Sequence, residues 1–600
     1  MKKIKVLFIM AIASIFMLTA CYHDYDSYEY LQAFKYEYQY DEKEEGYTLN
    51  VRIPLVRVPQ VSKKEKNPEY LKDLVPFGQE ELVLPSYYEG KPILKLSVLY
   101  SGGESALNRD TKIKHIVLPQ KLEEIDMFSF SKCSALTNIE IPDSVKIIGN
   151  YAFSDCSSLT SIHIPGSVEA IGNYAFSYCS SLTSIHIPES VKEIGNYAFS
   201  GCSSLTSINI PESVKAIGNN AFSNCDSLTS INIPESVKAI GDYTFYSCSS
   251  LTSINIPESV TEIGVYAFSY CSLTSINIPE SVKEIGSYAY SGCSSLTNIE
   301  IPDSVKIIGN APFNCCSSLT SIIVDENNPV YDSRNNCNAI IESESNTLIN
   351  GCANTVIPNG VKEIGDYAFS DCSSLTSINI PESVEEIGDY AFSDCSSLTS
   401  INIPESVKAI GDDAFCGCSS LTSINIPESV EVIGDYAFYD CSSLTSINIP
   451  GSVKHIDSST FRGCSSLTSI NISQGITQIN DYAFYGCSSL TSISIPSSVI
   501  RIGDEAFSYC TALKSIRILG RLQYVGDKIF KDCNALETIE LSVFGGLYNV
   551  RNYFYNYSNV YFFYSGTIEE FKEKFEFGEN GEYIIHCSDG DINASYWREK

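Results

Sequence analysis

The sequence predicts a β-rich solenoid in which short coils stack along one axis. Versions of the motif A-F-x-x-C-S-S-L-T-S-I-x-I-P-x-S-V-x-x-I-G occur seventeen times in the 600 residues, nearly always with a period of 23 residues. A coil of this length cannot bury its apolar face alone, so neighbouring coils must cover one another. We therefore expect roughly 19–20 stacked coils and an extended surface rather than a compact domain.

Each element of a coil follows from the letters of the motif. Residues 159–164 alternate apolar and polar side chains, which predicts a strand with its apolar face inward. Pro165 ends the strand because it has no N–H to donate, and Gly172 allows a tight turn. Residues 174–176 are expected to form a short helical turn that fills the coil with its Phe. The expected fold is a parallel sheet of one short strand per 23-residue coil, with short helical turns and capped ends.

The repeat divides the chain into parts. We expect the solenoid to cover residues 81–541, with a tether and N-terminal cap at 21–80 and a C-terminal cap at 542–600, since a solenoid would otherwise expose apolar surface at its ends. A separate ligand-binding module at 542–600 is the alternative. Residues 325–358 form an irregular coil without the Phe-x-x-Cys anchor, and their two apolar runs predict a protruding hairpin. This hairpin is either a binding feature or a plain loop insertion.

The N-terminus has the pattern of an export signal. A basic start is followed by an apolar run over residues 6–18, which is short for a membrane span, and residues 1–20 are expected to be a signal peptide. The ending Leu-Thr-Ala-Cys resembles the bacterial lipobox, which implies cleavage before Cys21 and attachment of lipid to that residue. An exported, lipid-anchored protein at the bacterial outer-membrane surface is the expectation. An ordinary signal peptide with a chance Cys is the alternative.

Charge and motif content limit the functions to consider. The net charge of −32 argues against nucleic acid and anionic lipid as general partners, because both require a basic field. The six His residues show no metal-ligand or triad spacing, and no P-loop, G-x-S-x-G or H-E-x-x-H motif is present. One carboxylate per coil is too few for Ca²⁺, which takes ~6–8 oxygens. We therefore expect no enzyme activity, no metal and no cofactor.

The cysteines follow the repeat. Seventeen of the 23 Cys occupy one repeat position. Stacked Cβ atoms would point the same way, which suits a disulfide poorly, so a reduced inner ladder is expected, with some bridging as the alternative. Cys337 and Cys352 share the irregular coil and are the best candidates for a true pair.

The positions that packing does not explain are the best candidates for binding. In each strand the residue between the two inward apolar side chains points outward, and a Ser stands two positions earlier in most copies. Amide and hydroxyl rows of this kind can hydrogen-bond an extended polypeptide or glycan hydroxyls. Alternatively, the amides only satisfy one another. The predicted ligand-binding residues are Asn209, Asn232, Asn255, Asn277, Asn379, Asn402, Asn425, Asn448 and Asn471.

The motif L-T-S-I-x-I-P-x-S-V-x-x-I-G-x-Y-A-F-x-x-C resembles the leucine-rich repeat of BspA-like bacterial surface proteins. The resemblance covers residues 81–541, and residues 328–333 and 586–591 are similar to segments in such proteins. It implies a leucine-rich repeat solenoid, surface display, adhesion to host matrix proteins such as fibronectin and fibrinogen, and coaggregation between bacteria. The family offers no catalytic residues and no fixed binding positions to carry over.

Three functions fit these observations. The first is a surface-exposed lipoprotein adhesin that binds host matrix protein or other cells through the exposed sheet face. The lipid on Cys21 would anchor it in the membrane. The second is a structural spacer without a ligand, for which changes at the Asn positions would have no effect. The third is a glycan-binding receptor, whose binding would survive protease treatment of the ligand but not deglycosylation.

Overall fold

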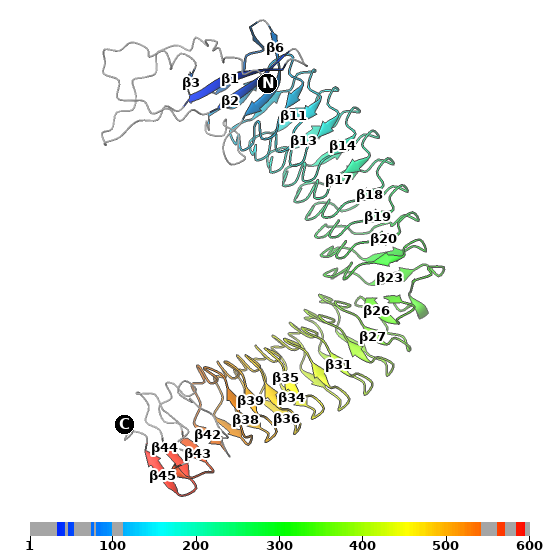
Figure 1. Cartoon of the computed structure of the whole chain (residues 1–600). Helices are drawn as coiled ribbons and strands as arrows, with labels where there is room; N and C mark the ends of the chain where they lie inside the picture. Colours follow the sequence, from blue (N-terminus) through cyan, green and yellow to red (C-terminus); the bar gives the residue numbers. More distant parts are fainter. Residues whose placement is uncertain are drawn as a thin grey trace, which may run out of the picture. The chain divides into compact units, whose positions relative to one another are not determined.

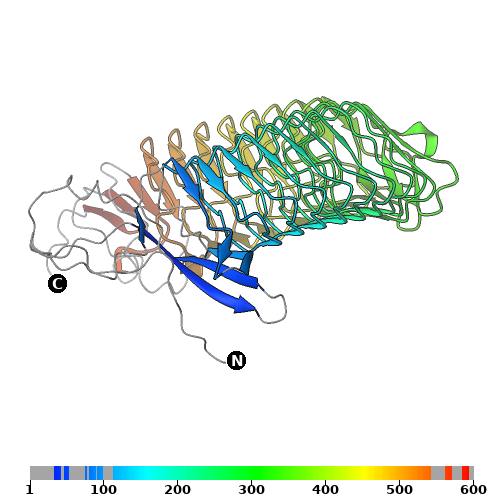
Figure 2. The same cartoon turned by 90° about the horizontal axis from the view of Figure 1, so that it is seen from above.

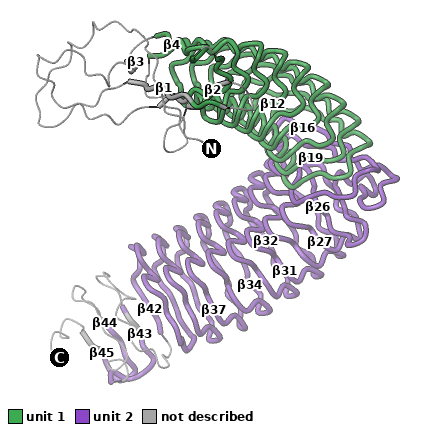
Figure 3. Tube along the Cα trace, turned by 45° about the horizontal axis from the view of Figure 1, so that its top comes forward, with its two compact units in different colours: residues 1–293 green, residues 294–600 purple. Residues whose placement is uncertain are grey.

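A computed structural model describes most of the chain as stacked coils. The described residues are 33–41, 46–52, 74–76, 80–89, 91–98, 112–541, 561–569 and 584–593. The chain divides into two compact units, unit 1 (residues 1–293) and unit 2 (residues 294–600), which we describe separately (Figure 3). The expected signal peptide and Cys21 lie outside the described residues. Within each unit, short parallel strands repeat coil after coil (Figure 1).

Most coils contribute one strand to each of two rows of parallel strands, which we call the first and second sheets although their hydrogen bonding is interrupted in places. In one coil, β11 (Ser161–His163) belongs to the first sheet and β12 (Ala170–Ile171) to the second. Both strands pair in register with those of the next coil, β13 (Ser184–His186) and β14 (Glu193–Ile194). The first-sheet strand is the predicted one, and its exposed–buried–exposed pattern confirms the expected alternation. The second strand has only two residues and was not expected, since the sequence predicts a single strand per coil. Figure 2 shows the row of loops that the coils form.

Unit 1 begins with an antiparallel addition to its second sheet. β1 (Ala33–Asp41) pairs antiparallel with β2 (Gly46–Arg52) and β3 (Leu74–Pro76), and β2 pairs in parallel with β6 (Lys91–Val98), which also takes β5 (Tyr87–Tyr88). The other first-sheet strands are β4 (Glu81–Val83), β7 (His115–Val117), β9 (Asn138–Glu140), β15 (Ser207–Asn209) and β17 (Ser230–Asn232). The other second-sheet strands are β8 (Glu124–Ile125), β10 (Ile147–Ile148), β16 (Ala216–Ile217), β18 (Ala239–Ile240), β19 (Glu262–Ile263) and β20 (Glu284–Ile285).

Unit 2 repeats the arrangement. Its first-sheet strands are β21 (Asn298–Ile301), β23 (Ser321–Val324), β28 (Ser377–Asn379), β30 (Ser400–Asn402), β32 (Ser423–Asn425), β34 (Ser446–Ile449), β36 (Ser469–Ile472), β38 (Ser492–Ile495), β40 (Ser515–Ile518) and β42 (Thr538–Leu541). Its second-sheet strands are β22 (Ile307–Ile308), β27 (Glu363–Ile364), β29 (Glu386–Ile387), β31 (Ala409–Ile410), β33 (Val432–Ile433), β35 (His455–Ile456), β37 (Gln478–Ile479), β39 (Arg501–Ile502) and β41 (Tyr524–Val525). The first sheet continues past the recognisable repeats with β43 (Tyr561–Tyr564), β44 (Ile584–Cys587) and β45 (Gly590–Asn593).

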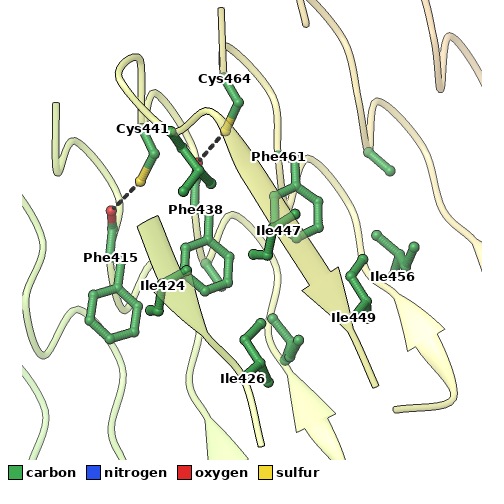
Figure 4. Packing of buried hydrophobic residues seen from close by; sticks show 14 of the residues in the cluster. Phe415, Ile424, Ile426, Phe438, Cys441, Ile447, Ile449, Ile456, Phe461 and Cys464 are labelled. Atoms are coloured by element: carbon green, nitrogen blue, oxygen red, sulfur yellow. Dashed lines mark hydrogen bonds between the residues drawn. The ribbon is translucent and has the colours of Figure 1, made fainter. Parts of the chain in front are cut away.

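Rows of identical side chains form the core of each unit. Phe415 and Phe438 are fully buried, and their rings stack with centroids 5.4 Å apart (Figure 4). The Sγ of Cys441 donates a 3.2 Å hydrogen bond to the carbonyl oxygen of Phe415, and Cys464 does the same to Phe438. Each buried thiol therefore satisfies a backbone carbonyl of another coil.

The cysteines of the ladder are thiols, as expected. Cys156 and Cys395 are fully buried, and burial raises the pKa of each of these two thiols well above its ordinary value. The pair proposed for the irregular coil does not form. Cys337 Sγ lies 3.9 Å from the carbonyl oxygen of Ala339, and Cys352 Sγ lies 3.4 Å from that of Asn338. Each sulfur therefore contacts a carbonyl oxygen of the irregular coil, and the two sulfurs are not bonded to each other.

The expected helical turn is replaced by consecutive tight turns. Tyr174 and Tyr178 both have a φ of +57°, a left-handed conformation that interrupts a helix. This conformation costs about 1–2 kcal/mol for a non-glycine residue. Stacking offsets part of the cost, because the Tyr174 ring lies 4.4 Å from the rings of both Tyr151 and Tyr197. The structure gives a reason for glycine at Gly172 other than the expected tight turn. A Cβ at this position would lie only 2.7 Å from the backbone N of Asn150.

The irregular coil contains the expected hairpin, and one strand of the hairpin joins the second sheet. β25 (Ile340–Glu342) pairs antiparallel with β24 (Tyr331–Asp332) and with β26 (Thr347–Asn350), and a 3-10 turn lies at Arg334–Asn336. β26 pairs in parallel with β27, so the insertion is built into the second sheet. Asp332 binds the guanidinium of Arg334 through both oxygens and accepts a 2.7 Å hydrogen bond from Ser343. These contacts give the insertion a structural role.

Candidate binding surface

The first sheet of unit 1 presents four of the predicted asparagines. Asn209 and Asn232 pair in register in β15 and β17, and Asn255 continues the row through a single bridge to Asn232. Asn277 occupies the corresponding position of the next coil, and all four side chains are exposed. The inward neighbours of these residues, such as Ile208, are buried, so the strand alternation holds the amides on the outer face.

The first sheet of unit 2 presents the other five. Asn379, Asn402 and Asn425 occupy register positions in β28, β30 and β32, and Asn448 pairs with Asn471 in β34 and β36. All five are exposed. The Nδ2 of Asn471 donates to the Oδ1 of Asn448, and within the described part of the chain this is the one hydrogen bond that joins two of the nine asparagines. Most of the amides are therefore open to solvent or to a ligand.

Two hydroxyl rows flank the asparagines, and they differ in availability. The Oγ1 of Thr206 donates a 3.3 Å hydrogen bond to the carbonyl oxygen of Thr183, and Thr422 donates similarly to Thr399. The protons of these Thr hydroxyls are therefore engaged in hydrogen bonds between neighbouring coils. The Ser hydroxyls one residue further, such as that of Ser207, are exposed on the same face as the amides. Ser and Asn side chains together form a neutral surface rich in donors and acceptors.

Charged side chains form ion pairs between coils. In unit 1, Lys192 Nζ lies 3.4 Å from Glu169 and Lys146 Nζ lies 2.9 Å from Glu123. In unit 2, the hydrogen bond from Lys362 holds the pKa of Glu385 below its ordinary value. Among the described residues, no group of three or more His, Cys, Asp or Glu side chains is arranged to hold a metal ion. The part of the chain that the structure describes also holds no helix of the length and apolarity that a membrane crossing requires.

The outward row changes character at its C-terminal end. After Ser494 it continues through Arg517, Glu540, Phe563 and His586, which pair in register along β38, β40, β42, β43 and β44. Each follows the previous one by 23 residues, so the period persists where the repeat letters are lost. The sequence predicts that Phe563 and His586 lie in the C-terminal cap, whereas the structure shows that they continue the outward row. We call the following residues the C-terminal patch: Arg517, Glu540, Tyr561, Phe563, His586 and Asp591.

The patch combines ion pairs with exposed rings. Arg517 Nε lies 2.9 Å from Glu540 Oε1. The ring of His586 stacks on that of Phe563 at 4.9 Å, and its Nδ1 lies 2.8 Å from Asp591 Oδ1. A hollow of about 510 Å³ opens beside these groups on the outer face of β36, β38, β40, β42 and β43. Its lining includes Ser494, Ser515, Arg517, Thr538, Glu540 and Phe563.

Comparisons with known proteins agree with this architecture. The model of the BspA type leucine-rich repeat region matches residues 103–229, 215–340, 341–468 and 431–561. A leucine-rich repeat protein from Bacteroides ovatus is 30% identical, with 69% of this chain and 93% of that chain covered and a TM-score of 0.47. A leucine-rich cell surface protein from Faecalibacterium prausnitzii is 25% identical, with 73% and 93% covered and a TM-score of 0.39.

A search of curated proteins gives no significant match. The four matched segments of the family model together cover residues 103–561 without a gap, which is well over half of the chain. The stacked parallel strands and the buried Phe, Ile and Leu rows are the structure that this repeat requires. The chain belongs to the BspA type leucine-rich repeat family.

Proposed function

We propose that the protein is a lipid-anchored adhesin of the bacterial surface that binds an extracellular protein through the outer face of its first sheet. The observation that carries the proposal is the exposed Asn row, in which the amides are presented in register and, except for Asn448 and Asn471, are not joined to one another. An extended polypeptide has backbone donors and acceptors at regular spacing, and such a surface matches them.

The chemistry of the surface favours binding over catalysis. Amide and alcohol side chains do not ionise near neutral pH, whereas the groups with strongly raised pKa, such as Cys395, are buried in the core. A catalytic site needs titratable groups that face a substrate. The family and the "cell surface" description of the similar Faecalibacterium prausnitzii protein support display outside the cell.

A binding screen tests this proposal. Soluble residues 22–600 are tested against immobilised fibronectin, fibrinogen and collagen, alongside a variant in which four outward residues become Lys. The changed residues are Asn209, Asn232, Asn402 and Asn425. We expect saturable binding that weakens at least tenfold in the variant, because long charged side chains occupy the face. Absence of binding to every protein of the panel would favour a spacer.

A charge-matched control separates position from charge. It also introduces four Lys, at residues that are exposed on the second sheet: Ile147, Ala216, Ile307 and Val432. We expect this control to bind like the unchanged protein. Equal loss in both variants would contradict a role for the first sheet. Treatment of the ligand with glycosidase tests the remaining alternative, since loss of binding after deglycosylation would identify a glycan receptor.

The anchor has a separate test. Growth of the producing bacterium with labelled palmitate should label the unchanged protein but not the variant Cys21→Ser. Protease treatment of intact cells should then degrade the lipidated protein if it faces outward. Labelling of the Cys21→Ser variant, or protection of the unchanged protein from protease, would contradict a lipid-anchored surface protein.

A further inference from the structure

The end of the first sheet in unit 2 has a surface unlike the Asn row. Where β34 and β36 present amides, β40, β42, β43, β44 and β45 present the C-terminal patch in the same outward register. Tyr561 and Phe563 are 44% and 43% exposed, which is high for large aromatic side chains. Exposed rings next to a hollow commonly mark a ligand site.

The one Arg of the patch is paired with a carboxylate. Arg517 is paired with Glu540, and His586 contacts Asp591. An anionic ligand would therefore find no unpaired cationic side chain in the patch, and the whole chain carries a charge of −32. The side chains of Arg517 and Glu540 remain 57% and 46% exposed, so each keeps donors or acceptors for a second partner. The patch thus favours an uncharged ligand that both donates and accepts hydrogen bonds.

The shape and lining of the hollow narrow the ligand class further. Its volume of about 510 Å³ lies within the usual range for small-molecule sites, about 300–1,000 Å³. Ser494, Ser515 and Thr538 contribute hydroxyls to its floor, and the Phe563 ring contributes an apolar face at one side. The ligand must therefore combine a polar rim with an apolar face. A sugar ring has both, because its hydroxyls lie around the edge and its C–H groups form the faces.

A peptide fits this end of the sheet less well. The strands beneath the hollow, including β40 and β42, pair on both sides, so their backbone groups cannot pair with an added peptide strand. A Pro-rich peptide would need an aromatic-lined groove. Here Phe563 is the single aromatic residue of the lining.

We propose that the C-terminal patch binds a neutral saccharide, with a sugar ring stacked on Phe563 or Tyr561 and its hydroxyls bonded to Arg517, Glu540 and the Ser and Thr side chains of the hollow. This site goes beyond the proposed adhesin function, since it uses other residues and another class of ligand. It lies wholly within unit 2.

Saccharide binding by the purified chain tests the proposal. Neutral trisaccharides of glucose, galactose, mannose and N-acetylglucosamine are titrated into residues 22–600 and followed by ligand-observed saturation-transfer NMR and calorimetry. We expect saturable binding of at least one of them. The variant Phe563→Ala should lose about tenfold in affinity, because the apolar face of the site is removed. Glu540→Gln, which keeps the size of the side chain, should also weaken binding.

Two controls make the result specific. Tyr178→Ala removes a ring that is 55% exposed in unit 1 and should leave saccharide affinity unchanged. Thermal unfolding by circular dichroism should be the same for Phe563→Ala and the unchanged protein, since the ring lies on the outer face. The proposal is overturned if no trisaccharide binds, if Phe563→Ala and Glu540→Gln leave affinity unchanged, or if the patch captures peptides from a random library but no saccharide.

The two proposals fail separately. Loss of the Asn row should abolish protein binding and leave saccharide binding intact, whereas Phe563→Ala should do the reverse. A variant that loses both activities would show that one surface serves both ligands, which would contradict a separate saccharide site.

Discussion

Units 1 and 2 use the same hydrogen bond, with mostly Asn as the acceptor in unit 1, where Asp242 is an exception, and Asp in unit 2. In unit 1 the Oδ1 of Asn150 accepts the backbone N–H of Asn173 at 2.8 Å, and the bond recurs at Asn173 and Asn196. In unit 2 the Oδ1 of Asp389 accepts the N–H of Asp412 at the same distance, and the bond recurs along an Asp row. The stack requires an acceptor at this position and accepts either an amide or a carboxylate.

The difference between the rows is charge. An Asn row is neutral, whereas carboxylates in coils stacked about 5 Å apart repel one another. Burial raises the pKa of Asp412, the N–H of Asp435 lowers it, and the charges of Asp389 and Asp435 raise it again, so that the net pKa is elevated. Among the described residues, all carboxyl groups with an upward pKa shift lie in unit 2: Glu363, Asp394, Asp412, Asp413 and Asp457. Repeat geometry and electrostatics are therefore separable in this fold.

The largest expected effect is common to both units and concerns thiol chemistry. Burial raises the pKa of Cys293 in unit 1, and of Cys416 in unit 2, to about 12. Against the ordinary value of 9.0 this lowers the thiolate fraction roughly a thousandfold. Alkylation by iodoacetamide near pH 8, followed by mass spectrometry, should be slow at both residues and slower at Cys293, which is fully buried. Fast labelling of Cys293 in the folded protein would contradict the packed ladder.

The next effect tests whether the two cores are equivalent. Phe199 and Phe415 are fully buried, and each stacks between two rings at 5.3–5.6 Å. Replacing either by Ala should cost about 3–5 kcal/mol of local stability. Hydrogen exchange of the mutated coil and its neighbours measures this loss. A difference of more than about 2 kcal/mol between Phe199→Ala and Phe415→Ala would break the equivalence of the cores.

A feature of unit 2 alone gives a smaller effect. Burial raises the pKa of Asp332, but the hydrogen bonds from Arg334 and Ser343 outweigh it, and the pKa is lowered. Its contribution to stability is therefore present above the ordinary Asp pKa and lost as the pH falls through the folded value. Asp332→Asn should cost about 1–2 kcal/mol near pH 7, seen as faster hydrogen exchange in residues 325–358. The control Ser345→Ala removes an exposed hydrogen bond and should have little effect.

The smallest effect concerns the Asp row directly. Because the pKa of Asp412 is elevated in the folded protein, its contribution to folding stability is fully present below the ordinary Asp pKa. This contribution is lost as the pH rises through the folded pKa. Asp412→Asn keeps the acceptor and removes the charge, so it should stabilise unit 2 by a few tenths of a kcal/mol near pH 7. Urea unfolding followed by circular dichroism should show this gain shrinking toward pH 4. The reverse double change, Asn173→Asp with Asn196→Asp, places carboxylates in adjacent coils and should weaken unit 1 near pH 7; a gain there would contradict the explanation.

Much of the fold follows from the sequence because the core letters recur. The alternation at Leu159, Ile162 and Ile164 predicts the first strand, and all three are buried. The second strand at Ala170–Ile171 is too short to give a periodic pattern. The positive φ of Tyr174 could not be predicted from the sequence either, since Tyr disfavours that conformation. Stacking on the neighbouring rings offsets part of its cost, and this contact is seen only in the structure.

The candidate sites were predictable to different degrees. The outward direction of Asn402 follows from strand alternation alone, and the structure confirms its exposure. The C-terminal patch was missed because the letters around Phe563 no longer match the motif, although the 23-residue spacing from Glu540 persists. The Asn and Asp acceptor rows, such as Asn173, were missed because their partners are backbone N–H groups of the next coil.

The central claim is that the ligand sits on the outer face of the first sheet. A photo-crosslinking amino acid placed at Asn425 would point outward from β32, and one placed at Val432 would point outward from β33 in the second sheet of the same unit. With a bound matrix protein, we predict a crosslink from position 425 and none from position 432. A crosslink from position 432 alone would contradict the account.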